Sequence, residues 1–260
     1  AGVQHTCAVS DTGISCWGPA GPGHQDPPEA PFADVGAGAQ HTCAVNPNGT
    51  ADCWGDDPDG RTTPTPGGYA QVEAGWSTSC GVTTDGGVQC WGGNEYGQAE
   101  PTDGTYAEVG VGEEFACGLT GAGALHCWGC VGASQDFGQC DPPAGQFVSL
   151  SVGWRHACAL GTDGQISCWG CDTTGWDSGP CGAPQGSFVA VSAGVSVTCA
   201  LNDAGAIACF GCDDPDWDFG QCGASAGVFT QVAAGRWHGA GLRSDGTVAC
   251  WGCQWEEPPG

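Results

Sequence analysis

Short apolar segments separated by turns rich in glycine and aspartate run along this chain, and none of them has a helical period. The clearest pair places Cys158 opposite Cys168 and Leu160 opposite Ile166, with the loop Thr-Asp-Gly at 162–164. A three-residue loop of this kind ends on a residue in the left-handed region, which glycine adopts without a side-chain penalty. The pattern therefore predicts a β-hairpin between the two cysteines.

The same hairpin occurs in seven copies. Five other copies also have glycine at the third loop position, at Gly49, Gly86, Gly123, Gly205 and Gly246. The first copy is one residue shorter, which predicts a two-residue turn at Asp11 and Thr12. An aromatic residue followed three positions later by Val or Leu precedes six of the hairpins, at Phe32, Tyr69, Tyr106, Phe147, Phe188 and Phe229. Each repeat is thus predicted to hold about three short strands.

All-strand repeats of about 40 residues are typical of propeller blades. We therefore predict an all-β fold, a seven-bladed β-propeller with short, about three-stranded, disulfide-stapled blades. A β-solenoid is the alternative, but its coils are usually shorter and lack a regular hairpin. The whole chain forms one predicted domain, with repeats at approximately 1–31, 32–68, 69–105, 106–146, 147–187, 188–228 and 229–260.

The consensus Gly-x-x-His-Thr-Cys-Ala-x-x-x-x-Gly-x-x-x-Cys-Trp-Gly resembles the repeat of the regulator-of-chromosome-condensation family of seven-bladed propellers. The segment Asn-Glu-Tyr-Gly-Gln at 94–98, after Trp91 and Gly92, matches the continuation of that repeat. The short repeat is closer to the secreted bacterial branch, which resembles the β-lactamase inhibitor protein II type. The resemblance covers the whole chain and implies the fold. It does not imply one function, because this fold hosts exchange factors, inhibitors and scaffolds.

The charged residues are almost all acidic. Four arginines and no lysine accompany 29 carboxylates, and the formal net charge is −25. Binding to nucleic acid requires a basic surface that neutralises phosphates, and the sequence encodes none. We therefore expect neither a nucleic-acid partner nor adhesion to anionic membranes. A surface with this negative charge keeps the protein solvated and is typical of adaptation to salty surroundings. It also attracts cations or basic partners.

Twenty cysteines in 260 residues indicate an oxidising compartment. Six disulfides are predicted across the hairpins: Cys7–Cys16, Cys43–Cys53, Cys80–Cys90, Cys117–Cys127, Cys158–Cys168 and Cys199–Cys209. Three more are predicted in the outer loops of the longer repeats: Cys130–Cys140, Cys171–Cys181 and Cys212–Cys222. Cys250 and Cys253 remain, and we expect them to pair with each other because Ala240 replaces the hairpin partner of Cys250.

The spacing Cys-x-x-Cys, as in Cys127 and Cys130, is also found in zinc and redox sites. The first three repeats keep the hairpin pair and lack the third cysteine. We therefore interpret the additional cysteine as part of a second disulfide in the same repeat, and not as part of a zinc or redox site.

The sequence contains no secretory signal and opens directly on a repeat at Gly2, so we expect a mature, exported chain whose signal has been removed. The hydrophobic stretches are too short to span a bilayer, and no membrane insertion is predicted. The predicted location is secreted or at the cell surface.

The tryptophans form two sets. Those at one repeat position are predicted to pack between blades: Trp17, Trp54, Trp91, Trp128, Trp169 and Trp251. Others stand one or two residues after the repeat glycine, where strands end on one face of the disc. Variable residues on a repeated scaffold form binding surfaces, and Trp and Arg are enriched at binding hot spots. The predicted partner-binding residues at these two positions are Trp76, Glu113, Glu114, Trp154, Arg155, Arg236 and Trp237.

Metal and catalytic chemistry have weaker signals. Four carboxylates of one outer loop are candidate calcium ligands: Asp213, Asp214, Asp216 and Asp218. Their spacing matches no standard calcium-binding loop, and the alternative is that they are solvated carboxylates of a turn. No other cofactor is predicted.

Four histidines share one repeat position: His5, His41, His156 and His238. The other repeats have Thr78, Phe115 and Val197 at this position, which is therefore a packing position. No nucleophile elbow, P-loop or dinucleotide motif occurs, so we predict that the protein is not an enzyme.

The first repeat has no aromatic-x-x-Val strand, and residues 253–260 contain no replacement. A trimmed sequence, a thin first blade and a strand supplied by another molecule are three open explanations. We predict an exported, non-enzymatic propeller that binds a protein or serves as a surface-structural subunit, with either a protein partner or self-association. The alternatives are an inhibitor of a secreted enzyme and a subunit of an extracellular filament assembled by strand-edge pairing.

Overall fold

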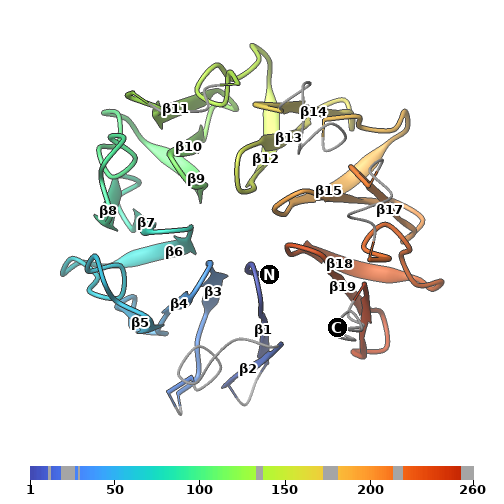
Figure 1. Ribbon diagram of the computed structural model, residues 1–260, viewed down its shortest axis with the longest axis horizontal. Helices are drawn as coiled ribbons and strands as arrows, with labels where there is room; N and C mark the ends of the chain where they lie inside the picture. The colour runs from blue at the N-terminus through green and yellow to red at the C-terminus, as the bar shows by residue number, and fades with distance from the viewer. Residues whose placement is uncertain are drawn as a thin grey trace, which may run out of the picture.

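Seven antiparallel sheets surround one axis in the computed structural model, which describes residues 1–10, 13–18, 27–28, 30–132, 137–171, 181–212 and 219–252 (Figure 1). Six sheets have three strands, and the sheet of the first repeat has two among the described residues. No helix occurs in these ranges. The predicted seven-bladed propeller is confirmed, with a first blade that differs from the others.

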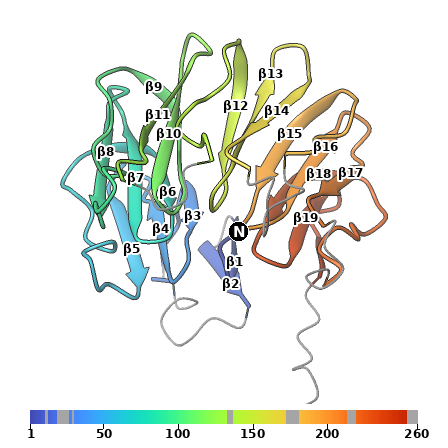
Figure 2. The ribbon, with the colours of Figure 1, turned by 45° about the horizontal axis from the view of Figure 1, so that its top comes forward.

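Each complete blade consists of an inner, a middle and an outer strand, in chain order from the axis outwards (Figures 1 and 2). The inner strands are β3 (Asp34–Ala37), β6 (Tyr69–Ala74), β9 (Tyr106–Val111), β12 (Phe147–Val152), β15 (Phe188–Ala193) and β18 (Phe229–Ala234). The middle strands are β1 (Thr6–Ser10), β4 (His41–Val45), β7 (Thr78–Thr83), β10 (Phe115–Thr120), β13 (Ala157–Gly161), β16 (Thr198–Asn202) and β19 (Gly239–Arg243). The outer strands are β2 (Gly13–Trp17), β5 (Ala51–Gly55), β8 (Val88–Gly92), β11 (Leu125–Gly129), β14 (Ile166–Trp169), β17 (Ile207–Phe210) and β20 (Val248–Trp251).

The register of the hairpins is the predicted one. Cys158 pairs with Cys168 and Leu160 with Ile166. The third loop residue has a positive φ in six hairpins, at Gly49, Gly86, Gly123, Gly164, Gly205 and Gly246. The turn predicted at Asp11 and Thr12 lies outside the described residues.

Nine of the ten predicted disulfides are present, six across the hairpins and three in the outer loops. Cys250 is also disulfide-bonded, and its predicted partner Cys253 lies outside the described residues. A chain with so many internal disulfides folds in an oxidising compartment.

Neighbouring blades meet at a contact that we call the seam. One blade contributes the residue two positions before the first cysteine position of its hairpin. The next blade contributes the residue directly before the first cysteine position of its own hairpin. Four seams pair a buried histidine with a hydroxyl at 2.7 to 2.8 Å: His5–Thr42, His41–Ser79, His156–Thr198 and His238–Thr6. The last pair joins the seventh blade to the first and closes the ring.

The other three seams contain no histidine. Their residue pairs are Thr78 with Ala116, Phe115 with Ala157, and Val197 with Gly239. Phe115 and Ala157 are fully buried in one apolar cluster, and the hydroxyl of Thr78 donates to Gly93 in its own blade. A hydroxyl therefore follows in the next blade only where the seam has a histidine to pair with it.

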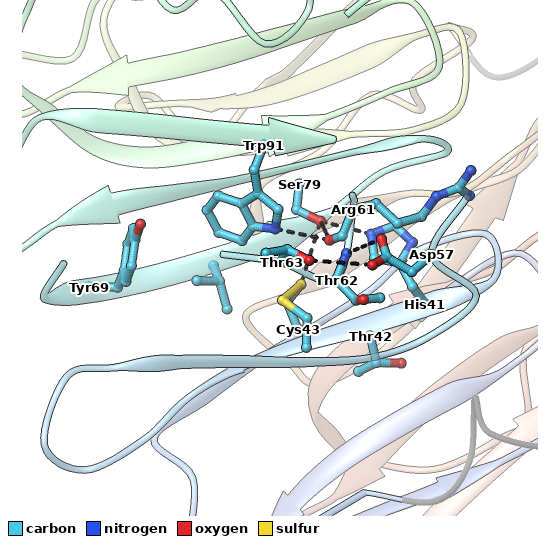
Figure 3. Close-up of a disulfide and its surroundings, with 12 residues drawn as sticks. His41, Thr42, Cys43, Asp57, Arg61, Thr62, Thr63, Tyr69, Ser79 and Trp91 are labelled. Carbon is cyan, nitrogen blue, oxygen red and sulfur yellow. Dashed lines mark hydrogen bonds between the residues drawn. A yellow bond between two sulfur atoms is a disulfide. The ribbon is translucent and has the colours of Figure 1, made fainter. Parts of the chain in front are cut away.

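The repeated tryptophans pack between blades, as predicted, and four of them are 5 to 8% exposed: Trp91, Trp128, Trp169 and Trp251. The indole of each donates a hydrogen bond to a carbonyl in the outer loop of the preceding blade, at Arg61, Gln98, Gln139 and Gln221. Figure 3 shows the first of these, where Trp91 and the hydroxyl of Ser79 converge on the Arg61 carbonyl. The outer loops are thus fixed by the next blade.

Candidate binding face

A belt of backbone hydrogen bonds holds the loops that follow the inner strands. In six blades the residue after the repeat glycine donates its N–H to a carbonyl of the next blade, as Ala39 does to the Gly75 carbonyl and Trp76 to the Gly112 carbonyl. A Cβ at Gly75 would stand 2.6 Å from the Gly112 oxygen, and one at Gly194 would stand 2.1 Å from the Gly235 oxygen. Only glycine permits this approach, so the belt fixes where the following side chains emerge.

The belt surrounds a small cavity of about 60 Å³ on the axis. Its wall is made of Gly, Ala and Val from successive blades, together with Trp76 and Trp154. The two indoles, from blades three and five, stack on each other with ring centroids 5.5 Å apart and an interplanar angle of 26°. Trp76 is 37% exposed, and the indole Nε1 of Trp154 is buried without a hydrogen-bond partner. The stack therefore places a large apolar surface beside the axis.

Charged side chains of blades four and five adjoin this stack. The guanidinium of Arg155 lies over the Trp154 ring, 4.1 Å from its centroid, and its Nε donates to Glu113 Oε2 at 2.9 Å. Five of the predicted binding residues thus lie together, and we call them the Trp–Arg face: Trp76, Glu113, Glu114, Trp154 and Arg155.

Next to Trp76, a groove of about 510 Å³ is lined by residues of blades two, three and four. Four carboxylates and one guanidinium line this acidic groove, together with Trp76 and Tyr96: Asp59, Glu95, Glu113, Glu114 and Arg61. Arg61 is 6% exposed, and its guanidinium donates to Asp59 and to the Trp76 carbonyl. Since Arg61 and Arg155 already pair with Asp59 and Glu113, the groove keeps a negative excess.

The acidic groove changes the ionisation of its own groups. Burial and the neighbouring Glu113 raise the pKa of Glu114 above its usual value. The charge of Glu114 in turn raises the pKa of Tyr96. A cation placed in the groove would relieve this repulsion, because an opposite charge favours the ionised carboxylate.

The sequence did not single out Arg61, Glu95 and Tyr96 as binding residues. They belong to outer loops, whose carbonyls are held by the tryptophan of the next blade, and this brings them to the Trp–Arg face. A signal was present, because Gly60-Arg61 stands where other repeats have Gly97-Gln98, Gly138-Gln139 and Gly220-Gln221. The buried glutamines each accept the N–H of the residue two positions earlier, whereas Arg61 binds Asp59 and Trp76 instead.

The two remaining predicted residues form a separate group on blade seven. The Arg236 guanidinium lies 4.0 Å from the centroid of the Trp237 ring, and Phe219 contacts the same ring at 5.3 Å. This repeats the stacking of arginine on tryptophan seen in blade five. The sequence prediction thus corresponds to two groups of residues in the structure.

The inner strands are also linked from blade to blade near the axis. Asp34 accepts the Val72 N–H, and Glu108 accepts the Leu150 N–H. Gln71 makes two such bonds, because its amide donates to the Val109 carbonyl and accepts the Val109 N–H. Burial raises the pKa values of Asp34 and Glu108, and burial together with Asp34 raises the pKa of Glu73 to about 8. Asp34 and Glu108 therefore join neighbouring blades.

The histidines occupy packing positions, as the sequence indicated. Burial lowers the pKa of His156 to about 4 and is also the main reason that the pKa of His238 falls to about 4. Both rings are therefore neutral at physiological pH and bonded across a seam. The hydroxyl partners were not predicted from the sequence. Thr198 stands one repeat after His156, next to the cysteine, and Thr6 has the same position in the first repeat, which the ring brings next to His238.

Among the described residues, no group of three or more His, Cys, Asp or Glu side chains is arranged to hold a metal ion. The calcium candidates Asp213, Asp214, Asp216 and Asp218 lie outside the described residues. In the described part of the chain there is also no helix of the length and hydrophobicity that a membrane span requires.

Comparison with known proteins agrees with this geometry. Four segments match the Regulator of chromosome condensation (RCC1) repeat family, at residues 32–61, 69–98, 147–175 and 229–254. No curated protein sequence is significantly similar to the chain.

Several solved propellers have the same fold. The CRINKLY WD40 ectodomain of the Arabidopsis thaliana receptor kinase ACR4 is 22% identical with a TM-score of 0.76, over 95% of this chain and 90% of that one. The entire ectodomain of the Physcomitrella patens receptor kinase CR4 is 24% identical with a TM-score of 0.77, over 97% and 71%. Yeast RCC1 (Prp20), solved bound to Kap60, is 17% identical with a TM-score of 0.65, over 84% and 69%.

The repeat match, the sevenfold ring and the hairpin register lead to one conclusion. The chain is a seven-bladed β-propeller with disulfides within its blades, and four of its segments match the RCC1 repeat family.

Proposed function

We propose that this propeller is an extracellular protein that binds another protein through the Trp–Arg face and acts by binding rather than by catalysis. The observation that carries the proposal is the Trp76–Trp154 stack, which adjoins both the Arg155–Glu113 pair and the acidic groove. Exposed aromatic surface beside a rim of polar groups is the usual composition of an interaction hot spot.

The charge of the face indicates the chemistry of the partner. The acidic groove has four carboxylates, and the chain as a whole has a formal charge of −25. A basic segment of the partner, presenting lysine or arginine, would fit the groove while an apolar side chain covers the indoles. Lysine suits this site because its apolar stem packs along Trp76 while its ammonium reaches Glu114.

Two solved propellers of this fold are receptor ectodomains, and another was solved in a complex with a protein, Kap60. The nine disulfides between described residues support an extracellular location as well. These comparisons support the proposal at the level of the fold and of the location.

The test compares native protein with Trp154→Ala and Glu114→Gln in affinity capture from the extracellular medium of the source, without reductant. A matched control is Val148→Ala, a 54% exposed valine at the opposite end of an inner strand. We expect a partner that is retained by the native protein and the control and is lost with Trp154→Ala. Equal capture by all variants would place the partner elsewhere.

Two narrower functions follow from the same scaffold. An inhibitor of a secreted enzyme would be monomeric, and an assay with a β-lactamase would show inhibition that Trp154→Ala removes. A filament subunit would instead form ordered polymers that electron microscopy detects in unreduced material. Discrete 26.0 kDa particles would support a soluble binder and contradict the filament.

A further inference from the structure

The guanidinium of Arg236 is half-buried without an acidic partner. Of the four arginines of the chain, Arg61 and Arg155 form ion pairs, with Asp59 and Glu113. The Arg236 side chain makes no ion pair or hydrogen bond with any described residue, although the chain has 29 carboxylates. Burial also lowers the pKa of Arg236. A partly buried charge without a partner costs free energy, so this guanidinium is available to an external anion.

Blade five shows which group fits beside such a guanidinium. Arg155 also lies over a tryptophan ring, and its Nε donates to Glu113 Oε2 at 2.9 Å. Glu113 is the residue after the repeat glycine of the preceding blade. In the blade that precedes Arg236, the two residues after this glycine are Val195 and Ser196, and neither is acidic. The carboxylate that blade five receives from its neighbour is therefore missing beside Arg236.

The tryptophan next to Arg236 orients the guanidinium. The Cζ atom of Arg236 lies over the Trp237 ring, 4.0 Å from its centroid. A guanidinium stacked on a ring keeps its N–H groups free, because they lie in the plane of the group and not towards the ring. Two parallel N–H groups fit the two oxygens of a carboxylate. The stack thus presents a donor pair for a carboxylate.

An apolar surface adjoins the donor pair. Phe219 is 47% exposed, and its ring centroid lies 5.3 Å from that of Trp237. The backbone holds Phe219 in place, because its N–H donates to Gln221 Oε1 at 2.6 Å and the Gln221 carbonyl accepts the Trp251 indole N–H at 2.9 Å. This outer loop of blade six is thereby fixed to blade seven. The apolar surface beside the guanidinium is therefore already formed before a ligand arrives.

The charge of the whole protein narrows the ligand further. A polyanion, such as a nucleic acid or a sulfated polysaccharide, is repelled by a formal charge of −25. A small molecule or chain end with one carboxylate pays little of this repulsion. Inorganic phosphate has no apolar part to cover Phe219. One carboxylate attached to an apolar group therefore fits both the guanidinium and its surroundings.

We propose that Arg236, Trp237 and Phe219 form a binding site for a carboxylate attached to an apolar group, as at the C-terminal residue of a polypeptide or in a free aromatic or aliphatic acid. The carboxylate accepts hydrogen bonds from Arg236, as Glu113 does from Arg155 in blade five. The apolar group covers Phe219. Blade seven lies across the axis from blades three and four (Figure 1), so the site is separate from the acidic groove and does not depend on the proposed function.

The probe is N-acetyl-phenylalanine, which has one carboxylate and one apolar ring, and its uncharged amide is the matched control. Each is titrated into unreduced protein labelled with ¹⁵N-tryptophan, in a buffer free of carboxylates. The indole N–H signal of Trp237 is identified by its loss in Trp237→Phe. We expect this signal to shift saturably with the acid, with a Kd of about 1 to 10 mM, and to stay in place with the amide.

Variants of the protein test each part of the site. Arg236→Gln should weaken binding by about tenfold or more, and Arg236→Lys should weaken it less because the charge remains while the paired donors are lost. Phe219→Ala should weaken it by about threefold. Arg243→Gln removes the same charge over the Phe229 ring and should leave binding unchanged. Trp154→Ala should also leave it unchanged, which separates this site from the proposed function.

A second acid distinguishes the two sources of the ligand. Equal binding of 3-phenylpropionate would assign the site to apolar acids in general, and binding of N-acetyl-phenylalanine alone would assign it to chain ends. The proposal is overturned if the Trp237 signal does not shift saturably up to about 50 mM acid. It is also overturned if the amide shifts the signal equally, or if Arg236→Gln binds as well as the native protein.

Discussion

The seams with a histidine and the seams without one solve the same packing problem in two ways. At the His156–Thr198 seam both side chains are 0% exposed and share a hydrogen bond of 2.8 Å, whereas Phe115 and Ala157 fill the same space with apolar atoms alone. A buried polar group is tolerated only with a partner. The comparison teaches that each seam is a unit of two residues from adjacent blades, in which a hydroxyl of one blade accompanies a histidine of the preceding blade and is replaced by alanine or glycine where that histidine is missing.

The largest expected difference between the two kinds of seam is in acid. The pKa of His156 is about 4 in the folded protein and about 6.5 when it is exposed, so the unfolded chain binds more protons between these values. The stability from this seam is complete above pH 6.5 and is lost as the pH falls towards 4, by about 3 kcal/mol. His238 adds a loss of the same sign, since its pKa is also lowered to about 4.

A buried carboxylate with a raised pKa acts in the opposite direction. The pKa of Glu73 is raised to about 8, so its contribution to stability grows as the pH falls from 8 towards its ordinary value. Comparing native protein with the double variant His156→Phe/Thr198→Ala cancels this contribution. Chemical unfolding at several pH values should show a smaller acid loss for the double variant. Identical pH profiles would mean that His156 titrates normally in the folded protein.

A smaller effect is expected from mixing the two kinds of seam. His156→Phe removes the hydrogen bond between the imidazole and the buried Thr198 hydroxyl, and we expect a loss of about 2 kcal/mol in the free energy of unfolding. Adding Thr198→Ala should recover about 1 kcal/mol or more, because the seam is then apolar on both sides. Denaturant unfolding of the unreduced proteins measures this coupling. Additive losses in the double-mutant cycle would contradict the two-residue unit.

The seam that closes the ring should respond locally. His238→Ala removes the bond to Thr6, and the first blade has only two described strands to hold it. We expect amide hydrogen exchange in β1 and β2 to accelerate by about tenfold, corresponding to an opening cost lowered by about 1.4 kcal/mol. His41→Ala, at a seam between blades two and three, is the control and should leave β1 and β2 unaffected. Faster exchange throughout the ring would show that closure is cooperative.

The smallest effect on stability is expected at the Trp–Arg face. Glu113→Gln breaks the ion pair with Arg155, whose two side chains are 20% and 26% exposed. Partly exposed pairs contribute little, so the free energy of unfolding should change by less than about 1 kcal/mol. Thermal unfolding checks this value. A loss as large as that of His156→Phe would assign the pair to the scaffold instead of to binding.

The features that the sequence predicted correctly are local. Cys158 opposite Cys168 and the glycine at position 164 follow from a hairpin of about ten residues, and its cysteine spacing and turn chemistry agree. The repetition of that hairpin then implies a ring of blades. The sequence also identified Trp76 and Trp154 as residues of one face, because both follow a repeat glycine.

Only the tertiary structure decided which of these residues meet. Trp76 stacks on Trp154 across blade four, and Arg61 reaches the Trp76 carbonyl from an outer loop. The sequence by itself determined the blade, since each blade is fixed by backbone geometry and cysteine spacing within about 40 residues. The ring determined which residues form the Trp–Arg face and which hydroxyl pairs with each histidine. Contacts between repeats depend on how blades pack around an axis, and repeat spacing alone does not encode that packing.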